Sequence, residues 1–366
     1  MKPPIRQGIY YWKCDRPAAF HGTAQGDSRR SPTELTELLR GVLARHFGRA
    51  PDALRDGGGQ GNHQTFHVTV AGREYFVRLE DGPERDDYLA VESFVMDIVR
   101  ARGVPTPQVI AVDASRREVP FAWQILEYVP APDLNRHFKA GTLELPAIAE
   151  QLGRLIATWQ EVPVAGFGPF AVDGAQAHSQ LRGLQRSYAD YFHTRFEAHL
   201  DFLVAREFLE APMAAEIRQE VARHRPLLDL PIGCLVHKDT ALWNLLGTER
   251  QILAVIDWDD CIAGDPLDDL SLFGCFHGGE ALRRAFAGYA AVRPLPPNFA
   301  LRFWLHLLRN MMFKAVIRVG AGYFNHDSRF FLIGADGDGA ALRTQTLGRL
   351  GAALRGLRDE GDPFSL

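Results

Sequence analysis

The sequence predicts an α+β fold with a small mixed lobe at residues 31–130 and a larger, mainly helical lobe at residues 131–366. Before residue 130, alternating apolar and polar residues typical of paired strands stand between two stretches with helical spacing. After Pro130 and Pro132 the apolar residues recur mostly at helical spacing. The prolines and this change of pattern indicate the boundary between the lobes.

Each element of the first lobe has a local signal. Ser31 can cap a helix, Pro32 fits its first turn, and Glu34 completes a capping box. Two alternating stretches joined by a turn at Gly72 predict a hairpin. In order, the expected elements are a helix from residue 31 to about 47, a glycine-rich stretch at 57–62, strands at 65–70 and 74–79, a helix at 88–102, and strands at 109–112 and 121–129.

The second lobe is predicted to consist mainly of helices. Apolar residues from Leu145 to Trp159 mark one face of its first long helix. Short apolar stretches before His237 and on both sides of the polar turn 247–250 predict a strand and a hairpin. Later helices are expected around 176–203, 207–225, 279–291 and 296–319.

Residues 1–30 form an N-terminal arm with two open interpretations. The segment from Ile9 to Cys14 is aromatic and strand-like, and residues 17–30 are small and polar. Such an arm either packs on the surface of a lobe or forms a lid over a pocket.

Composition excludes several kinds of protein. The chain has 366 residues, 46% hydrophobic and 23% charged, which is enough for two lobes. Its formal net charge of −4 argues against a strongly cationic surface for nucleic acids or membranes. The cysteines form no C-x-x-C pair, and no apolar run resembles a signal peptide or a membrane span. We therefore expect a reduced, cytoplasmic protein without a nucleic-acid or membrane partner, of unknown oligomeric state.

The most informative segment runs from His237 to Asp257. It contains Asp239, then Asn244 five residues later, then Asp257 at the end of the strand that closes the predicted hairpin. This order brings Asn244 and Asp257 to the ends of neighbouring strands, close enough to share a cation. Phosphoryl transfer from ATP requires a carboxylate that receives a hydroxyl proton, together with an amide and a second carboxylate that hold Mg²⁺.

The motifs of this region resemble those of the aminoglycoside phosphotransferase and choline kinase superfamily. Its members carry H-G-D-x-x-x-x-N, then I-D-W/F-D/E, then G-D-P-x-x-D-L, and the corresponding segments here begin at His237, Ile256 and Gly264. The resemblance covers roughly residues 33–335. It implies a bilobal protein-kinase-like fold, ATP and Mg²⁺ as cofactors, and phosphoryl transfer to a hydroxyl of a small molecule.

The resemblance also implies roles for individual residues. Asp239 would orient and deprotonate the acceptor hydroxyl, while Asn244 and Asp257 would bind Mg²⁺. His237 would anchor the catalytic loop, and Asp269 would brace that loop from the following helix.

On the nucleotide side, the resemblance implies a cation held by a helix glutamate. Arg78 stands where lysine is more familiar, and Glu92 would hold it; the alternative is a surface arginine and an unrelated helix glutamate. Arginine offers phosphate a planar fork and always carries its charge. The expected nucleotide-binding residues are Gly59 and Asn62 in the loop, Arg78, Glu92, and Glu127 and Val129 in a hinge whose backbone bonds to adenine.

The identity of the acceptor stays open. The candidates are an aminoglycoside or other antibiotic, an amino alcohol, a sugar or a related metabolite. Lys238 replaces the glycine that is commonest at its position, and it either contacts the γ-phosphate or points to solvent. The helix expected at 296–319 carries a polar stripe that either faces solvent or lines the acceptor cleft. The stripe consists of Arg302, His306, Arg309, Asn310, Lys314 and Arg318.

Two alternative functions remain. A nucleotide-binding pseudokinase would act as a binding module, but the base and both metal ligands are present. A kinase with a protein acceptor is disfavoured because Gly264 follows Asp257 almost at once and leaves no long activation segment.

Overall fold

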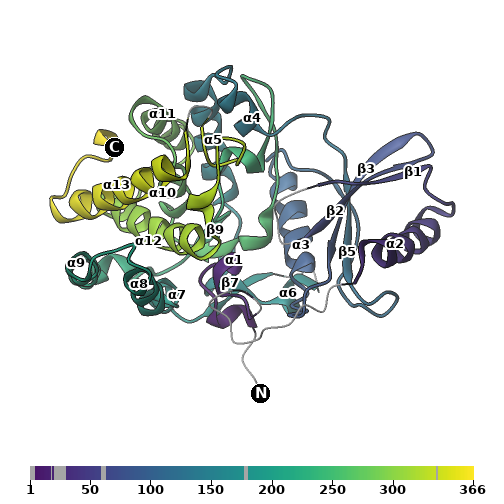
Figure 1. The fold of residues 1–366 in the computed structure, drawn as a ribbon, viewed down its shortest axis with the longest axis horizontal. Helices are drawn as coiled ribbons and strands as arrows, with labels where there is room; N and C mark the ends of the chain where they lie inside the picture. The colour runs from purple at the N-terminus through teal and green to yellow at the C-terminus, as the bar shows by residue number, and fades with distance from the viewer. Residues whose placement is uncertain (1–4, 18, 20–29, 59–62, 177–179, 335–336) are drawn as a thin grey trace.

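The computed structural model describes residues 5–17, 19, 30–58, 63–176, 180–334 and 337–366, and it has two lobes (Figure 1). The predicted α+β, bilobal protein-kinase-like fold class is confirmed. Within the described residues, no helix is long and apolar enough to span a membrane.

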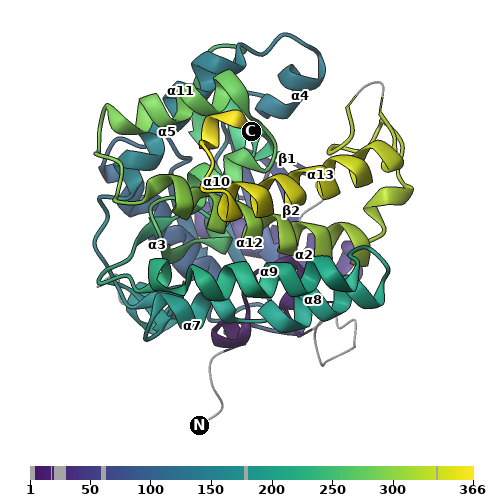
Figure 2. The same ribbon diagram turned by 90° about the vertical axis from the view of Figure 1, so that its left-hand side faces the viewer.

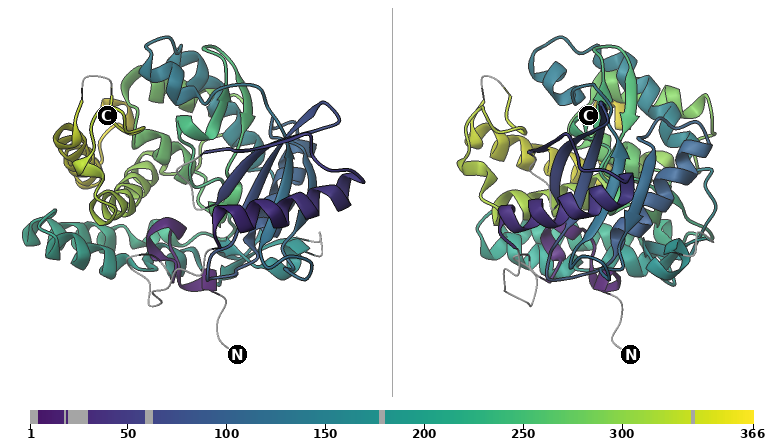
Figure 3. Two further views of the ribbon diagram at one scale, coloured as in Figure 1. Left: turned by 45° about the vertical axis from the view of Figure 1, so that its right-hand side comes forward. Right: turned by 90° about the vertical axis from the view of Figure 1, so that its right-hand side faces the viewer.

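The N-lobe is a five-stranded antiparallel sheet with helices on both faces, in the strand order β1-β2-β3-β5-β4. Helix α2 packs on one face through Leu35 and Leu39, which belong to the same buried hydrophobic cluster as Val77 and Ile125 of the sheet. Helix α3 lies on the side toward the other lobe (Figures 1 and 3). The elements are α2 (Pro32–Phe47), β1 (Ala53–Asp56), β2 (Gln64–Val70), β3 (Arg73–Glu80), α3 (Tyr88–Ala101), β4 (Val109–Asp113) and β5 (Ala122–Glu127).

The C-lobe is mainly helical around a second sheet and a small hairpin. Helices α12 and α13 pack against each other, with α8 and α9 beside them (Figure 2). The second sheet has the order β6-β8-β7-β12-β9. Its helices are α4 (Leu134–Lys139), α5 (Leu145–Trp159), α6 (Val172–Gln176), α7 (Tyr188–His193), α8 (Phe196–Ala205), α9 (Ala211–Arg223), α10 (Asp268–Gly274), α11 (Gly279–Ala290), α12 (Phe299–Gly320) and α13 (Gly339–Arg358). Its strands are β6 (Val164–Ala165), β7 (Phe167–Phe170), β8 (Leu181–Gln185), β9 (Cys234–Val236), β10 (Leu245–Gly247), β11 (Ile252–Val255) and β12 (Ile262–Gly264).

One expected helix is wrong. The region 176–203 contains strand β8 and the two short helices α7 and α8. Ser187 starts α7 by accepting a hydrogen bond from the backbone N–H of Asp190, and Arg195 separates the helices with a left-handed φ of 58°. The sequence analysis did not include β1, α4 or α13.

The N-terminal arm is not a strand, contrary to its aromatic pattern. Residues Trp12–Asp15 form the helical turn α1, and the preceding Tyr10 and Tyr11 are buried. Tyr10 stacks on Tyr191 at 4.9 Å between ring centroids, and Tyr11 stacks on Phe313 at 4.2 Å. The arm therefore inserts between helices of the C-lobe, unlike an arm that lies on the surface.

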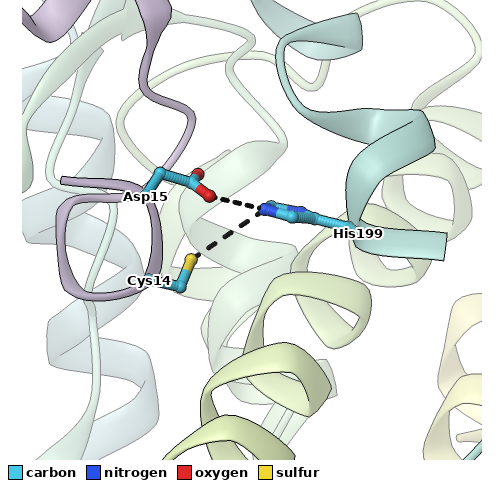
Figure 4. A group of neighbouring side chains, drawn as sticks. All are labelled: Cys14, Asp15 and His199. Carbon is cyan, nitrogen blue, oxygen red and sulfur yellow. Dashed lines mark hydrogen bonds and ion pairs between the residues drawn. The ribbon is translucent and has the colours of Figure 1, made fainter. Parts of the chain in front are cut away.

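A buried polar group anchors this arm (Figure 4). His199 Nε2 lies 2.9 Å from Asp15 Oδ1 and 4.0 Å from Cys14 Sγ. Because Arg309 donates to His199 Nδ1 at 3.1 Å, the imidazole carries its proton on Nε2 and donates it to Asp15. Burial raises the pKa of the Cys14 thiol, so the thiol keeps its proton. These protonation states favour a hydrogen-bonded anchor over a metal site.

Candidate active site

A loop that carries Asp239 begins where β9 ends, and His237 fixes its first turn. His237 Nε2 donates to the carbonyl of Ile256 at 2.9 Å, and its Nδ1 accepts from the backbone N–H of Asp239 at 3.2 Å. Burial lowers the pKa of His237, in keeping with a neutral imidazole. Both ring nitrogens hold backbone groups, so the side chain is suited to anchoring the loop.

Asp269 on α10 holds the same loop from behind. Its Oδ2 accepts from the backbone N–H of His237 and from the indole of Trp159, both at 3.0 Å, and its Oδ1 accepts from the backbone N–H of Lys238 at 3.0 Å. Burial raises the pKa of Asp269 to about 7, while the backbone donors act in the opposite direction. The carboxyl group thus joins α10 to two consecutive peptides of the loop.

Asp239 is oriented by three side chains. Asn244 Nδ2 donates to Asp239 Oδ2 at 2.9 Å and to its backbone carbonyl at 2.9 Å. Trp243 Nε1 lies 3.4 Å from Oδ2, and Lys314 Nζ lies 3.4 Å from Oδ1. Because Nδ2 of Asn244 is occupied by Asp239, the amide oxygen is the atom left to ligate a cation.

Arg78 connects the N-lobe to the floor of the cleft. It forms an ion pair with Glu92 through Nη1 and donates from Nη2 to Asp257 Oδ1 at 2.8 Å. Glu92 also accepts from the backbone N–H of Trp258 at 3.1 Å, which joins α3 to the residue after Asp257. The Asp257 side chain is 39% exposed while Glu92 is fully buried, so Asp257 is the carboxylate open to the cleft.

A second contact between the lobes is made by His63 and Asp259. His63 Nε2 lies 3.0 Å from Asp259 Oδ2, and Asp259 is buried while His63 is partly buried. Burial alone would raise the pKa of Asp259, but the hydrogen bond and charge of His63 and the nearby guanidinium groups of Arg78 and Arg6 lower it. The carboxylate is therefore ionised and holds the mouth of the β2–β3 hairpin over the cleft.

These groups line one cleft of about 1180 Å³ between the lobes. Asp239, Asn244 and Asp257 lie on it with Arg78 and Glu92. The expected loop residues Gly59 and Asn62 fall outside the described residues, but their neighbours Gly57 and Gly58 line the cleft. The predicted hinge also lines the cleft, through Glu127, Tyr128 and Val129.

Comparison with known proteins identifies the fold and the family. A family model described as the phosphotransferase enzyme family matches residues 52–304. The chain belongs to this family. The predicted enzyme class, a kinase that transfers a phosphoryl group to an alcohol, is confirmed with it, as is the predicted resemblance.

Individual relatives of this phosphotransferase are distant. The probable ketoamine kinase YniA of Escherichia coli (strain K12) is 24% identical over 291 residues, 77% of this chain and 93% of the relative. Hygromycin-B 4-O-kinase of Escherichia coli is 25% identical over 252 residues, 64% of this chain and 65% of the relative.

Solved structures agree on the fold. Aminoglycoside phosphotransferase APH(4)-Ia, in a ternary complex with AMP-PNP and hygromycin B, aligns with a TM-score of 0.62 and 19% identity, over 87% of this chain and 98% of that chain. Macrolide 2'-phosphotransferase MphH from Brachybacterium faecium aligns with a TM-score of 0.54 and 17% identity, over 89% and 98%.

Lys238 of the phosphotransferase points neither to the nucleotide side nor to solvent. Its side chain is 1% exposed, and Nζ lies 2.8 Å from Asp268 Oδ2 and 3.0 Å from both Tyr10 Oη and Asn310 Oδ1. Its backbone has a left-handed φ of 72°. This conformation explains why glycine suits the position, because a side chain there costs about 1–3 kcal/mol of strain.

The polar stripe of α12 is buried, so a solvent-facing stripe is wrong for this phosphotransferase. Arg302 and His306 contact Asp265, and Asn310 contacts Asp268. Lys314 and Arg318 line the cleft, which is the second interpretation that the sequence allowed. The stripe is therefore mostly a set of polar contacts inside the lobe, and only its last turns reach the cleft.

The sequence analysis allowed for a lid over a pocket but named no residue of the arm as part of the cleft. Tyr11 and Lys13 line the cleft, although they precede the family match by about forty residues. A run of three aromatic residues, Tyr10 to Trp12, is the available signal, since such a run in a polar arm indicates burial against a partner surface.

Proposed function

We propose that this phosphotransferase moves the γ-phosphoryl group of ATP to a hydroxyl of a small molecule, with Asp239 as the base. The observation that carries the proposal is the position of Asp239, whose carboxylate lies on the cleft and is held by Asn244, Trp243 and Lys314. A carboxylate fixed in this way can orient a hydroxyl and accept its proton. The proton leaves the hydroxyl oxygen as its bond to phosphorus forms, and the bond between the γ-phosphorus and the β,γ-bridging oxygen breaks.

The residues on the floor of the cleft fit Mg²⁺. Asn244 has its amide oxygen available, and Asp257 presents a partly exposed carboxylate beside it in the cleft. Hard oxygen ligands of this kind suit Mg²⁺, which would neutralise charge on the phosphates when bound. Asn244 and Asp257 would hold it.

Arg78 and Glu92 support nucleotide binding on the other side of the cleft. Arg78 is buried and held by Glu92, so its guanidinium is fixed before a ligand arrives. A preorganised guanidinium fork suits the α- and β-phosphates of ATP. The backbone of Glu127 to Val129 would take adenine, and Gly59 and Asn62 would cover the phosphates.

The direct test is ADP release with ATP, Mg²⁺ and a panel of hydroxylated small molecules. Asp239→Asn keeps the shape of the side chain but removes the base, so acceptor-dependent ADP release should fall by about 10²–10⁴-fold. Asp201→Asn, at an exposed ion pair with Arg218, is the matched control and should behave as the unchanged enzyme. Retention of full turnover in Asp239→Asn would refute the assignment of the base.

A further inference from the structure

The acceptor side of the cleft carries two buried cations on one helix. Lys314 and Arg318 are four residues apart on α12, so they are neighbours on one face of the helix. They are 7% and 3% exposed, and both line the cleft that contains Asp239. Both lie against the ring of Phe276, with Nζ at 4.8 Å and Cζ at 5.9 Å from its centroid.

Lys314 already has a counter-charge, but it is the catalytic base. Its Nζ is 3.4 Å from Asp239 Oδ1, at the limit of a hydrogen bond. A hydroxyl that approaches Asp239 therefore also approaches Lys314.

Arg318 has no counter-charge. Its Nη1 donates to Thr346 Oγ1 at 2.7 Å, and within the described part of the chain no carboxylate lies within 4.0 Å of the guanidinium. Burial lowers the pKa of Arg318 to about 10, which still leaves it charged at neutral pH. A buried charge without a partner is costly, so such a group is kept where a ligand provides the partner.

The other buried arginines show how the chain pairs such groups when their role is internal. Arg6 contacts Asp86 at 2.6 Å, and Arg78 contacts Glu92 and Asp257. The guanidinium of Arg309 donates hydrogen bonds to the carbonyls of Phe192 and Thr194 and to His199 Nδ1. Arg318 also faces the cleft, as Arg78 does, but it differs from all three in having a single hydroxyl as its acceptor.

Asp260, one of the acidic residues that line the cleft, already has partners within the protein. Asp260 Oδ1 lies 3.9 Å from Arg6 Nη1 and accepts from the backbone N–H of Trp12 at 3.3 Å. Lys13, another cleft residue, adds positive charge, and its Nζ lies 5.5 Å from the ring centroid of Tyr323, which also lines the cleft. Trp243 and Phe331 add an aromatic wall, with ring centroids 5.0 Å apart.

From this arrangement we propose that the acceptor is an anionic alcohol, a small molecule with a carboxylate or phosphate group that binds Arg318 and Lys314 and a hydroxyl that reaches Asp239. This proposal rests on the proposed function and narrows its acceptor class. The oxyanion stays unchanged in the reaction, while the hydroxyl oxygen gains the phosphoryl group. A polycationic acceptor is disfavoured, because it would meet two buried cations in a medium of low polarity.

The test measures binding without turnover, in protein saturated with ADP and Mg²⁺ so that the nucleotide site is filled. The probes share a six-carbon polyol: gluconate, glucose 6-phosphate, glucose and glucosamine. Calorimetry should show at least one of the two anions binding about tenfold or more tighter than glucose, and glucosamine binding no better than glucose. In Arg318→Gln this preference should shrink to about threefold or less.

A matched control and the outcomes that would contradict the proposal complete the test. Arg329 also lines the cleft but is 90% exposed and paired with Asp327, so Arg329→Gln should keep the preference. Equal binding of anions and glucose, no binding by any probe, or a preference that survives Arg318→Gln would overturn the proposal. A further outcome separates this proposal from the proposed function. If anions bind in a way that depends on Arg318 but no acceptor stimulates ADP release, the anion site is supported and the proposed function is refuted.

Discussion

Lys238 and Asp268 form a fully buried ion pair behind the loop that carries Asp239, with Nζ 2.8 Å from Oδ2. Asp268 lies in the first turn of α10 and is next to Asp269, which binds the backbone of the loop. Lys238 is therefore held by α10 at two points. Its side chain pairs with Asp268, and its backbone N–H donates to Asp269. The ammonium group of Lys238 also binds the N-terminal arm, because Nζ donates to Tyr10 Oη at 3.0 Å.

Lys238→Met is expected to lower stability and to have little effect on nucleotide binding. It leaves Asp268 buried without its cation, which costs about 3–5 kcal/mol. The double variant Lys238→Met with Asp268→Asn should recover much of this loss. Urea unfolding measures the stability, and KM for ATP measures the nucleotide site. Unchanged stability together with a large rise in KM for ATP would show that Lys238 acts on the phosphates instead.

Arg302 and Arg318 lie on the same helix but should respond oppositely to substitution. Arg302 pairs with the fully buried Asp265, so Arg302→Gln should cost about 1–3 kcal/mol by weakening a buried acceptor's contacts. Arg318→Gln removes a buried charge that has no carboxylate partner in the described chain, so the free energy of unfolding should stay unchanged or rise. Chemical denaturation without ligand compares the two, and a larger loss in Arg318→Gln would indicate an internal structural role.

The fold could be predicted from the sequence, and so could the placement of Asp239, Asn244 and Asp257 on one cleft, because their signals are local. Asp239, Asn244 and Asp257 keep fixed spacings around a hairpin, and the strands alternate over a half-buried sheet. The environment of α12 could not be predicted, because the same polar stripe is compatible with solvent or with buried partners from α10. The arm was equally ambiguous, since its partners Tyr191 and His199 are more than 180 residues away in the chain.

Arg78 is expected to support ATP binding through the planar geometry of its guanidinium group as well as through its charge. Its two Nη atoms reach Glu92 and Asp257, a geometry that a lysine ammonium cannot reproduce. Arg78→Lys should therefore lower kcat/KM for ATP by about tenfold and Arg78→Met by about 100-fold, since a charge-assisted hydrogen bond contributes about 1.5–3 kcal/mol. Steady-state kinetics with ATP varied measures both. Equal activity of Arg78→Lys and the unchanged enzyme would show that charge alone suffices.

The anchor of the N-terminal arm should contribute to the acid stability of the protein. Burial alone would raise the pKa of Asp15, but the hydrogen bond from His199, the backbone N–H of Tyr11 and the charge of Arg309 lower it below its ordinary value. A carboxyl group with a lowered folded pKa stabilises the protein above its unfolded pKa of about 3.9, and this stabilisation is lost as the pH falls through the folded value. Asp15→Asn should therefore lose stability at neutral pH and show a flatter decline in acid.

Unfolding by urea at a series of pH values measures this difference between Asp15→Asn and the unchanged protein. The expected gap in unfolding free energy is widest near neutral pH and narrows as the medium becomes acidic. Asp173→Asn, at a largely exposed ion pair with Arg182, is the matched control and should follow the unchanged protein at every pH. A constant gap across the acid range would mean that Asp15 stabilises the arm through its hydrogen bonds to Tyr10 and Tyr11 alone, with no contribution from its ionisation.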